Sequence, residues 1–570
     1  MKKITYLIAF MAMVFATSCS SELDTVNLYG KSLESFYKTP TDIDEAMAGV
    51  YNAMYTLNVH SNESMAANLM DNMMLGGGGP DDKSAKWADN FEDPQDDTYQ
   101  DMWTQSYNGI SRANGIIEKT EATDFTSFFD TPEEALAFKD QSIGEAYFMR
   151  AFYFFRLAKF FGGVPLIINL DTPRDIPRAT YEETYAQIAS DLVTAIERMP
   201  ATSFQSIPTS SYGHANKWIA EAYLARVYLY YTGYMTNMNG QATSELPLVD
   251  GGTLSASQVT TYLDDCIQNS GYALVSDFRN LWPYSYVNEV ANNDTTLPWA
   301  AAEGLAWVGQ DGTNPTFGTG NSETMFMQRY SFGNWGWDNG NIYTNRFALF
   351  SGMRGQSLVP FGEGWGWCTI NPVLWSGWDD ADPRKVGSII KVGEADQGTA
   401  GYEPSKGDQE TGYWNKKYTA IQNVPDGGGD VTGMFIQMYQ WGDSDMQLMH
   451  AQDFIFMRFA DVLLMHSEIS GTSDGMNRVR SRAGLIPVGY SIEALKQERL
   501  HELAFEGLHW FDLVRWGDVD TAFSQTIQVN NSGVEGNYKV NYRPETKGLI
   551  SIPETQIRLS NGVYNQNPGW

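Results

Sequence analysis

The chain has 570 residues, of which 42% are hydrophobic and 14% aromatic, and its formal net charge is −31. This length is enough for several subdomains around large cores, and the composition is typical of a folded protein rather than a disordered one. The negative charge argues against nucleic acid and polyanionic substrates, because both would be repelled at long range.

The N-terminus has the pattern of a secretory signal. Lys2 and Lys3 precede an apolar run over residues 4–15, which is too short to remain as a membrane span. Small residues then stand directly before Cys19, as in a lipoprotein signal-peptidase site. We therefore predict a signal peptide at 1–18 and a lipid anchor on Cys19; the alternative is an ordinary secretory signal with an accidental cysteine. The other two cysteines, Cys266 and Cys368, are expected as free buried thiols, with a disulfide between them as the alternative.

Several segments of the N-terminal half have the apolar period of a helix. They cover residues 45–54, 103–117, 145–161, 184–199 and 215–231. We expect the first helix to be capped by Thr41 or Asp42 and the third to end at Gly162. Small residues recur where helices would have to approach closely, at Ala146, Ala151, Ala222 and Ala225. This pattern favours tetratricopeptide-like helix pairs, although no clean 34-residue period is visible.

A polar loop over residues 76–101 separates the first two of these helices. Its glycine run before Pro80 is expected to be flexible, and it has no Gly-Lys-Ser/Thr ending, so it does not predict a phosphate loop. The acidic run at 92–97 has carboxylates for calcium but not the spacing of an EF-hand, so a solvated loop is favoured.

The middle of the chain is rich in tryptophan, glycine and asparagine, and its prolines make long helices improbable there. Exposed aromatic loops need a reason, and a flat ring can stack on the C–H face of a sugar. Polar groups for the sugar hydroxyls follow at Asp338, Asn339, Asn345 and Arg346. Nine tryptophans fall in this belt, namely Trp282, Trp299, Trp307, Trp335, Trp337, Trp365, Trp367, Trp375 and Trp378.

The alternative is that most of these rings fill small cores, since large aromatics are mostly buried. Two motifs are the best candidates for ligand contact, because a glycine between alternating rings favours a turned, accessible loop. They are Trp335-Gly-Trp337 and Trp365-Gly-Trp367, whereas Trp375 and Trp378 are expected to be structural. The predicted glycan-binding set is Trp335, Trp337, Asp338, Asn339, Trp87, Tyr284, Tyr286, Trp307, Trp365 and Trp367.

Residues 497–517 place charged and large apolar side chains together in one predicted helix. Glu498, Glu502 and Glu506 repeat on one side, and Arg499 and Arg515 are the expected partners for these charges. Two Glu-x-x-His steps end at His501 and His509, but both would lie on one helix and could not face each other across a di-metal site. A paired structural helix is therefore the favoured interpretation.

Catalytic motifs give no support for an enzyme. The letters Gly-x-Ser-x-Gly at 471–475 follow a predicted helix instead of a strand, so they predict an interhelical turn and not a nucleophile elbow. With 69 acidic residues, no glycosidase pair can be chosen from the sequence. We expect a non-catalytic binding protein without a cofactor.

The segment 497–517 resembles the C-terminal signature of the SusD/RagB family, the outer-membrane glycan-binding lipoproteins of Bacteroidota. Other strings add to the resemblance, at residues 145–166, 215–226, 458–464, 477–484, 550–553 and 565–570. The acidic residues after Cys19 are similar to the motif that sends such lipoproteins to the cell surface. The resemblance thins between about 235 and 440, and His509 departs from the arginine that is more frequent in the family.

This resemblance implies a mainly α fold of tetratricopeptide-like helix pairs, with a loop-rich, mixed capping subdomain that carries the aromatic residues. The expected organisation is a signal peptide at 1–18, helical repeats at 19–240, the aromatic region at 241–440 and the C-terminal family helices at 441–570. It also implies that the loop before the helix at Trp103 contributes to the sugar site, which is why Trp87 is included. Trp103 is assigned to the core because it lies on the apolar stripe of the predicted helix.

By the same resemblance, the function would be capture of a neutral oligosaccharide at the cell surface and delivery to a SusC-like TonB-dependent transporter. The expected location is the outer membrane, through the lipid anchor. Two alternatives stay open, a peptide-capturing lid of the same architecture and a structural lid without its own ligand.

Overall fold

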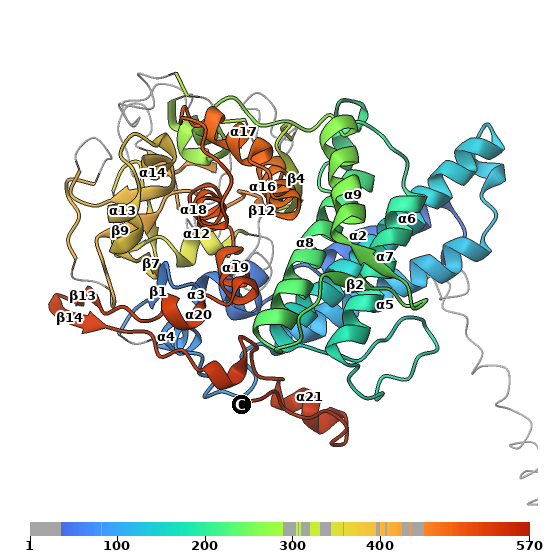
Figure 1. Ribbon diagram of the computed structural model, residues 1–570, viewed down its shortest axis with the longest axis horizontal. Helices are drawn as coiled ribbons and strands as arrows, with labels where there is room; N and C mark the ends of the chain where they lie inside the picture. Colours follow the sequence, from blue (N-terminus) through green and yellow to red (C-terminus); the bar gives the residue numbers. More distant parts are fainter. Residues whose placement is uncertain are drawn as a thin grey trace, which may run out of the picture.

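Long helices lie side by side in the N-terminal half of the chain (Figure 1). Along the chain, α5 packs on α6, α6 on α7, α7 on α8 and α8 on α9, while α2 lies against α5. The bounds are α2 Pro40–Asn52, α5 Gln100–Ala122, α6 Pro132–Phe161, α7 Tyr181–Arg198, α8 Lys217–Asn237 and α9 Ala256–Asn269. The computed structural model describes residues 36–80, 82–288, 304–305, 307–308, 320–330, 344–356, 358–394, 399–404, 407–423, 432–435 and 450–570.

Local capping signals start and end these helices. Thr39 caps α2, with Pro40 at the first position and a reciprocal bond between Thr39 and Asp42. The prediction of Thr41 or Asp42 as the cap was therefore wrong by a few residues, because Asp42 supplies the returning half of a capping box. The predicted end of α6 is confirmed at Gly162, whose φ of 78° is easily reached only by glycine.

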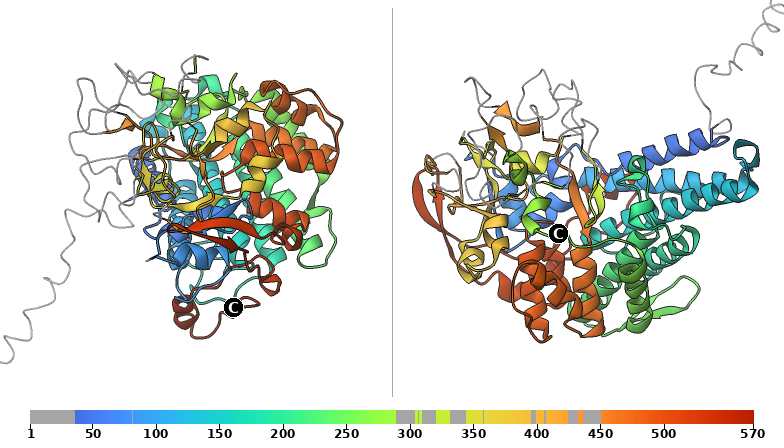
Figure 2. Two further views of the ribbon diagram at one scale, coloured as in Figure 1. Left: turned by 90° about the vertical axis from the view of Figure 1, so that its left-hand side faces the viewer. Right: turned by 90° about the horizontal axis from the view of Figure 1, so that it is seen from above.

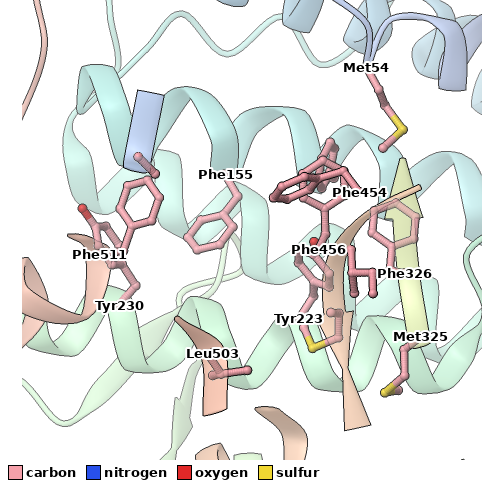
Figure 3. Close-up of a cluster of buried hydrophobic side chains, with 14 of the residues drawn as sticks. Met54, Phe155, Tyr223, Tyr230, Met325, Phe326, Phe454, Phe456, Leu503 and Phe511 are labelled. Carbon is pink, nitrogen blue, oxygen red and sulfur yellow. The ribbon is translucent and has the colours of Figure 1, made fainter. Parts of the chain in front are cut away.

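The core joins these helices to a two-stranded ladder from the second half of the chain. Strand β4 Thr324–Gln328 pairs antiparallel with β12 Phe454–Arg458. Aromatic side chains of the ladder pack on those of α6 and α8 (Figure 3). The ring of Phe152 lies 5.5 Å from both Phe326 and Phe456, and Phe148 meets Tyr223 edge to face at 5.2 Å. The aromatic α6 therefore holds the two halves together.

Short elements make up the remainder (Figures 1 and 2). The helices are α3 Glu63–Leu69, α4 Ser84–Asp89, α12 Arg346–Phe350, α13 Pro372–Gly377, α14 Pro383–Ser388, α16 Phe459–Ser470, α17 Asp474–Arg482, α18 Ile492–Leu503, α19 His509–Trp516, α20 Val519–Ala522 and α21 Glu554–Leu559. The two-stranded pairs are β1 Met74–Gly77 with β7 Trp367–Ile370, β2 Glu245–Pro247 with β3 Thr253–Ser255, β5 Met353–Arg354 with β6 Glu363–Gly364, β8 Ile389–Lys391 with β9 Tyr413–Asn415, β10 Gln422–Asn423 with β11 Thr432–Gly433, and β13 Ile527–Asn531 with β14 Val534–Tyr538. The predicted mainly α class with a mixed, loop-rich part is confirmed, and Cys266 and Cys368 are free and buried as expected.

The C-terminal segment 497–517 is two helices, so the prediction of one continuous helix was wrong. The chain leaves the helical conformation between α18 and α19, where Phe505 and Gly507 have φ of 68° and 73°. Contacts from α3 explain the break: Asn68 donates to the carbonyl of Phe505 at 3.2 Å, and a Cβ on Gly507 would lie 3.0 Å from the Cα of Ser64. The break lets Glu506 point toward Arg458 and Lys417.

A buried ion network holds α18 in place. The three glutamates pair with cations from elsewhere in the chain, whereas the predicted partners Arg499 and Arg515 instead bind Asp461, Asp512 and Glu468. Five cations face five carboxylates, so the charge is balanced where its burial would otherwise be costly. The cations are Arg384, Lys417, Arg458, Arg480 and Arg482, and the carboxylates are Glu323, Asp382, Glu498, Glu502 and Glu506.

His509 still makes an ion pair, although the family more often has arginine there. Its Nδ1 lies 2.7 Å from Asp71 Oδ1. Burial alone would lower the pKa of His509, but the attraction and hydrogen bond of Asp71 outweigh it and raise the pKa above 6.5. The Glu-x-x-His residues therefore have structural partners: the rings of His501 and Trp378 stack at 4.3 Å, and Glu498 and Glu506 bind arginine and lysine.

We expect the His509–Asp71 pair to make stability depend on pH. A histidine with a raised folded pKa contributes fully below its unfolded pKa, and the contribution is lost as the pH rises through the folded value. The difference in melting temperature between the wild type and His509→Gln should therefore be largest near pH 6 and should shrink toward pH 9. Thermal denaturation of both proteins across this range measures it, and a constant difference would contradict the prediction.

Candidate functional site

Two predicted surfaces that are far apart in sequence lie side by side. Strand β1, in the glycine-rich segment, pairs with β7 so that Gly77 is opposite Trp367, and Gly78 N donates to Gly366 O at 2.7 Å. A Cβ on Gly77 would lie 2.2 Å from the same carbonyl. The expectation of a flexible glycine run was wrong, because these glycines are buried and allow close backbone packing.

Helix α12 packs against the Trp365-Gly-Trp367 motif. The ring of Phe350 lies 4.6 Å from Trp365 and 4.4 Å from Trp367. Trp367 is 2% exposed, whereas Trp365 is half-buried. The packing therefore holds Trp365 against Phe350 and leaves part of its indole at the surface.

The loop before α3 forms the adjoining edge. The guanidinium of Arg346 lies 5.2 Å above the Phe350 ring and donates to the carbonyl of Leu57, which is 54% exposed. Beneath them, the His60 ring is 4.8 Å from Trp367. Burial lowers the pKa of His60 to about 4, so the imidazole is neutral near pH 7. We call the surface of Leu57, Arg346 and Trp365 over Phe350 the aromatic patch.

Trp87 lies on α4, which packs on the strand that pairs with β7. Helix α4 packs on β1, and a Cβ on Gly76 would be only 2.8 Å from the backbone of Ala85 and Lys86. The indole of Trp87 is half-buried, and its predicted contact with a glycan stays a prediction. The adjacent Lys86 forms an ion pair with Asp408, which ties α4 to the loop before β9.

Trp335, Trp337, Asp338 and Asn339 lie outside the described residues. The bordering residues Tyr330 and Thr344 line a cavity of about 20 Å³ together with Val59 and Arg346. The described residues that border this segment, Tyr330 and Thr344, therefore lie close to Arg346 of the aromatic patch. Arg346, noted in the sequence as a polar neighbour of the tryptophans, lies in this patch, whereas Asn345 is buried and caps α12.

Three of the predicted sugar platforms are core residues. Tyr284 is fully buried and donates to the carbonyl of Gly387 at 2.8 Å, and Trp307 is 8% exposed and donates to Leu281 O at 3.2 Å. With Trp367, they have no open ring face for a sugar, so these predictions are corrected. Tyr286 lies in the short 3-10 helix Pro283–Asn288, but its side chain is outside the description.

The tryptophans predicted to be structural are packed as expected. Trp378 is 2% exposed and donates to Asp382 at 2.9 Å, and the half-buried Trp375 lies 5.5 Å from the Tyr413 ring. Cys19, the predicted lipid site, lies outside the described residues. The predicted set missed Leu57, His60 and Phe350, which come from segments with no aromatic run to mark them.

The aromatic patch has the chemistry of a binding surface. An indole face can cover the apolar side of a flat ligand, and the Arg346 guanidinium can donate to its edge.

Ser473, in the Gly-x-Ser-x-Gly letters, lies in the turn between α16 and α17, as predicted. Within the described residues, no group of three or more His, Cys, Asp or Glu side chains is placed to hold a metal ion. In the same part of the chain, no helix is long and apolar enough to cross a membrane.

Known proteins resemble the chain over nearly its whole length. A family model described as "Starch-binding associating with outer membrane" matches residues 25–229, and one described as "SusD family" matches residues 371–570. The curated "SusD-like protein P2" of Formosa agariphila is 24% identical over 599 residues, which cover all of both chains.

Solved structures share the fold. A "Laminarin binding SusD-like protein" is 23% identical, with a TM-score of 0.66 over 94% of this chain and 100% of that one. Surface glycan-binding protein A from Bacteroides thetaiotaomicron, in complex with laminarihexaose, is 18% identical, with a TM-score of 0.66 over 93% of this chain and 100% of that one.

Proposed function

Since this chain belongs to the SusD/RagB family, we propose that it is a cell-surface lipoprotein that captures oligosaccharides and delivers them to a SusC-like TonB-dependent transporter. Cys19 would carry the lipid that anchors it to the outer membrane. The protein would bind its ligand without chemical turnover.

The aromatic patch is the observation that carries the ligand class. It combines a supported indole with a guanidinium donor, and Tyr330 and Thr344, which border the segment of Trp335 and Trp337 in the sequence, line a cavity with Arg346. Aromatic faces with edge-on donors suit sugars, whose rings have apolar faces and polar rims. Two relatives with this fold have laminarin or laminarihexaose in their names, which supports a neutral glucan. The net charge of −31 agrees with a neutral ligand.

We expect native gels that contain laminarin, or another neutral glucan, to retard the mature protein. The same gels without polysaccharide and an unrelated protein of similar size are the controls. Polygalacturonate should not retard it, because the acidic protein would repel a polyanion. If no polysaccharide in the panel retards the protein, the glycan proposal fails, and the peptide-capturing or purely structural lid becomes the better hypothesis.

A further inference from the structure

A second hollow lies in the helical part of the molecule and is lined by other residues than the aromatic patch. It is a groove of about 350 Å³ that is lined by residues of α5, the segment 167–174 and the C-terminal segment around α21. This volume is within the range of small-molecule sites, roughly 300–1,000 Å³. The cavity beside the aromatic patch has only about 20 Å³. We call this second hollow the helical groove.

Aromatic side chains form its floor: Trp103 and Tyr564 are buried, at 3% and 7% exposed, and the half-buried Tyr107 carries the open ring surface. Trp103 and Tyr107 are one turn apart on α5, with their rings 5.3 Å apart, and Tyr564 lies 6.0 Å from Trp103. The hydroxyl of Tyr107 donates to Pro165 O at 2.8 Å, and that of Tyr564 donates to Arg174 O at 3.0 Å. The floor is therefore formed before any ligand arrives, which lowers the ordering cost of binding.

The acidic loop at 92–97 holds the far wall. Asp97 accepts from the backbone N of Thr555 at 2.9 Å and from its hydroxyl at 2.7 Å, where α21 begins. This part of the loop was expected to be solvated, and it instead fixes the C-terminal segment. Gln556, the next residue of α21, lines the groove.

Polar groups along the walls are available to a ligand. In the described chain, the Nδ2 of Asn169, the guanidinium of Arg174 and the amide of Gln556 have no hydrogen-bond partner, although all three line the groove. The Oδ1 of Asn169 accepts from Asp171 N at 3.1 Å and from the Thr172 hydroxyl at 2.8 Å, so the amide orientation is fixed. The described lining residues include no carboxylate.

We propose that the helical groove is a second saccharide site, which takes one or two units of a neutral sugar chain. Amides, hydroxyls and a guanidinium match sugar hydroxyls, and the half-buried ring of Tyr107 matches the apolar face of a sugar ring. The ligand class rests on the proposed function, whereas the groove shares no residue with the aromatic patch. A polymer held at both places would dissociate more slowly than one held at either place alone.

The test uses the mature protein and the disaccharide laminaribiose. Crystals soaked in laminaribiose should show the sugar in the groove, and saturation-transfer NMR should show binding by the Trp365→Ala variant. The Asn169→Ala/Gln556→Ala double variant should bind laminaribiose at this place at least about tenfold more weakly, equivalent to about 1.4 kcal/mol. The control is Asn239→Ala/Gln241→Ala, two half-buried or exposed amides after α8, which should leave binding unchanged.

Failure of this inference is distinct from failure of the proposed function. An empty groove, or equal laminaribiose binding by the groove and control variants, overturns the second site even where a polysaccharide retards the protein. Sugar in the groove without retardation by any polysaccharide supports the second site and overturns the proposed main site. Thermal denaturation of each variant establishes that it is folded.

Discussion

Replacing Glu502 by glutamine is expected to lower the free energy of unfolding by about 3–5 kcal/mol, because it leaves buried arginines without their shared counter-charge. Glu502 is fully buried and accepts hydrogen bonds from Arg458 at 2.8 Å, from Arg384 at 3.0 Å and from Arg482. Burial alone would raise the pKa of Glu502, but the three arginines outweigh it and hold the pKa well below its ordinary value. The carboxylate is therefore charged across the physiological range.

An exposed pair of the same chemistry provides the control. Glu394 pairs with Lys391 at 2.6 Å, and both side chains are about 40% exposed. Because water screens such pairs, Glu394→Gln should change the free energy of unfolding by less than about 1 kcal/mol. Urea denaturation followed by tryptophan fluorescence measures both variants. Equal losses in the two would show that the buried network does not stabilise the fold.

The lowered pKa of Glu502 also sets the pH below which its contribution to stability is lost. A carboxylate with a lowered folded pKa stabilises the protein above its unfolded pKa, near 4.5, and the effect is lost only as the pH falls through the folded value. Glu502 therefore resists mild acid, while His509 loses its contribution in the opposite direction, as the pH rises through its raised pKa. The C-terminal helices should be most stable between these limits.

Structural features that depend on residues close in the sequence could be predicted from the sequence. The helix ending at Gly162 and the packed Trp378 follow from spacing, capping and nearby partners, so the sequence was sufficient for both. The break after α18 was missed because its causes, Asn68 and Ser64, are on a helix more than 400 residues earlier. Periodicity carries no information about a contact of that kind.

The sequence identified separate segments of the candidate site, but it did not predict that these segments lie together. The glycine-rich segment and the Trp365–Trp367 motif were each recognised, but only the β1–β7 register places them together. Burial separated the tryptophans: Trp365 and Trp367 have the same sequence setting, but only Trp367 lies in β7 and is buried, whereas Trp365 precedes the strand, across Gly366 with its φ of 83°, and stays half-buried. Choosing between them requires the strand position, which the loop-rich sequence does not specify.

Trp365→Ala is expected to weaken glycan binding by about 10- to 30-fold, on the order of 1.4–2 kcal/mol, because it removes a supported ring face from the aromatic patch. Affinity electrophoresis against the retarding polysaccharide gives the dissociation constants. Trp375→Ala is the matched control, since Trp375 is also half-buried but packs on Tyr413 and Lys385 outside the patch. It should leave the dissociation constant within about twofold, well under 1 kcal/mol.

Two further variants separate stacking from other roles of this residue. Trp365→Phe keeps an aromatic face against Phe350 and should restore most of the affinity, whereas a purely structural role would appear as a lowered melting temperature in Trp365→Ala. The Trp335→Ala/Trp337→Ala double variant should lose retardation, because both are predicted glycan platforms and the described residues that border their segment, Tyr330 and Thr344, line a cavity with Arg346. If the double variant loses binding while Trp365→Ala keeps it, the sugar platform lies within residues 331–343 and Trp365 only supports them. If neither variant weakens binding, the aromatic patch is not the glycan site.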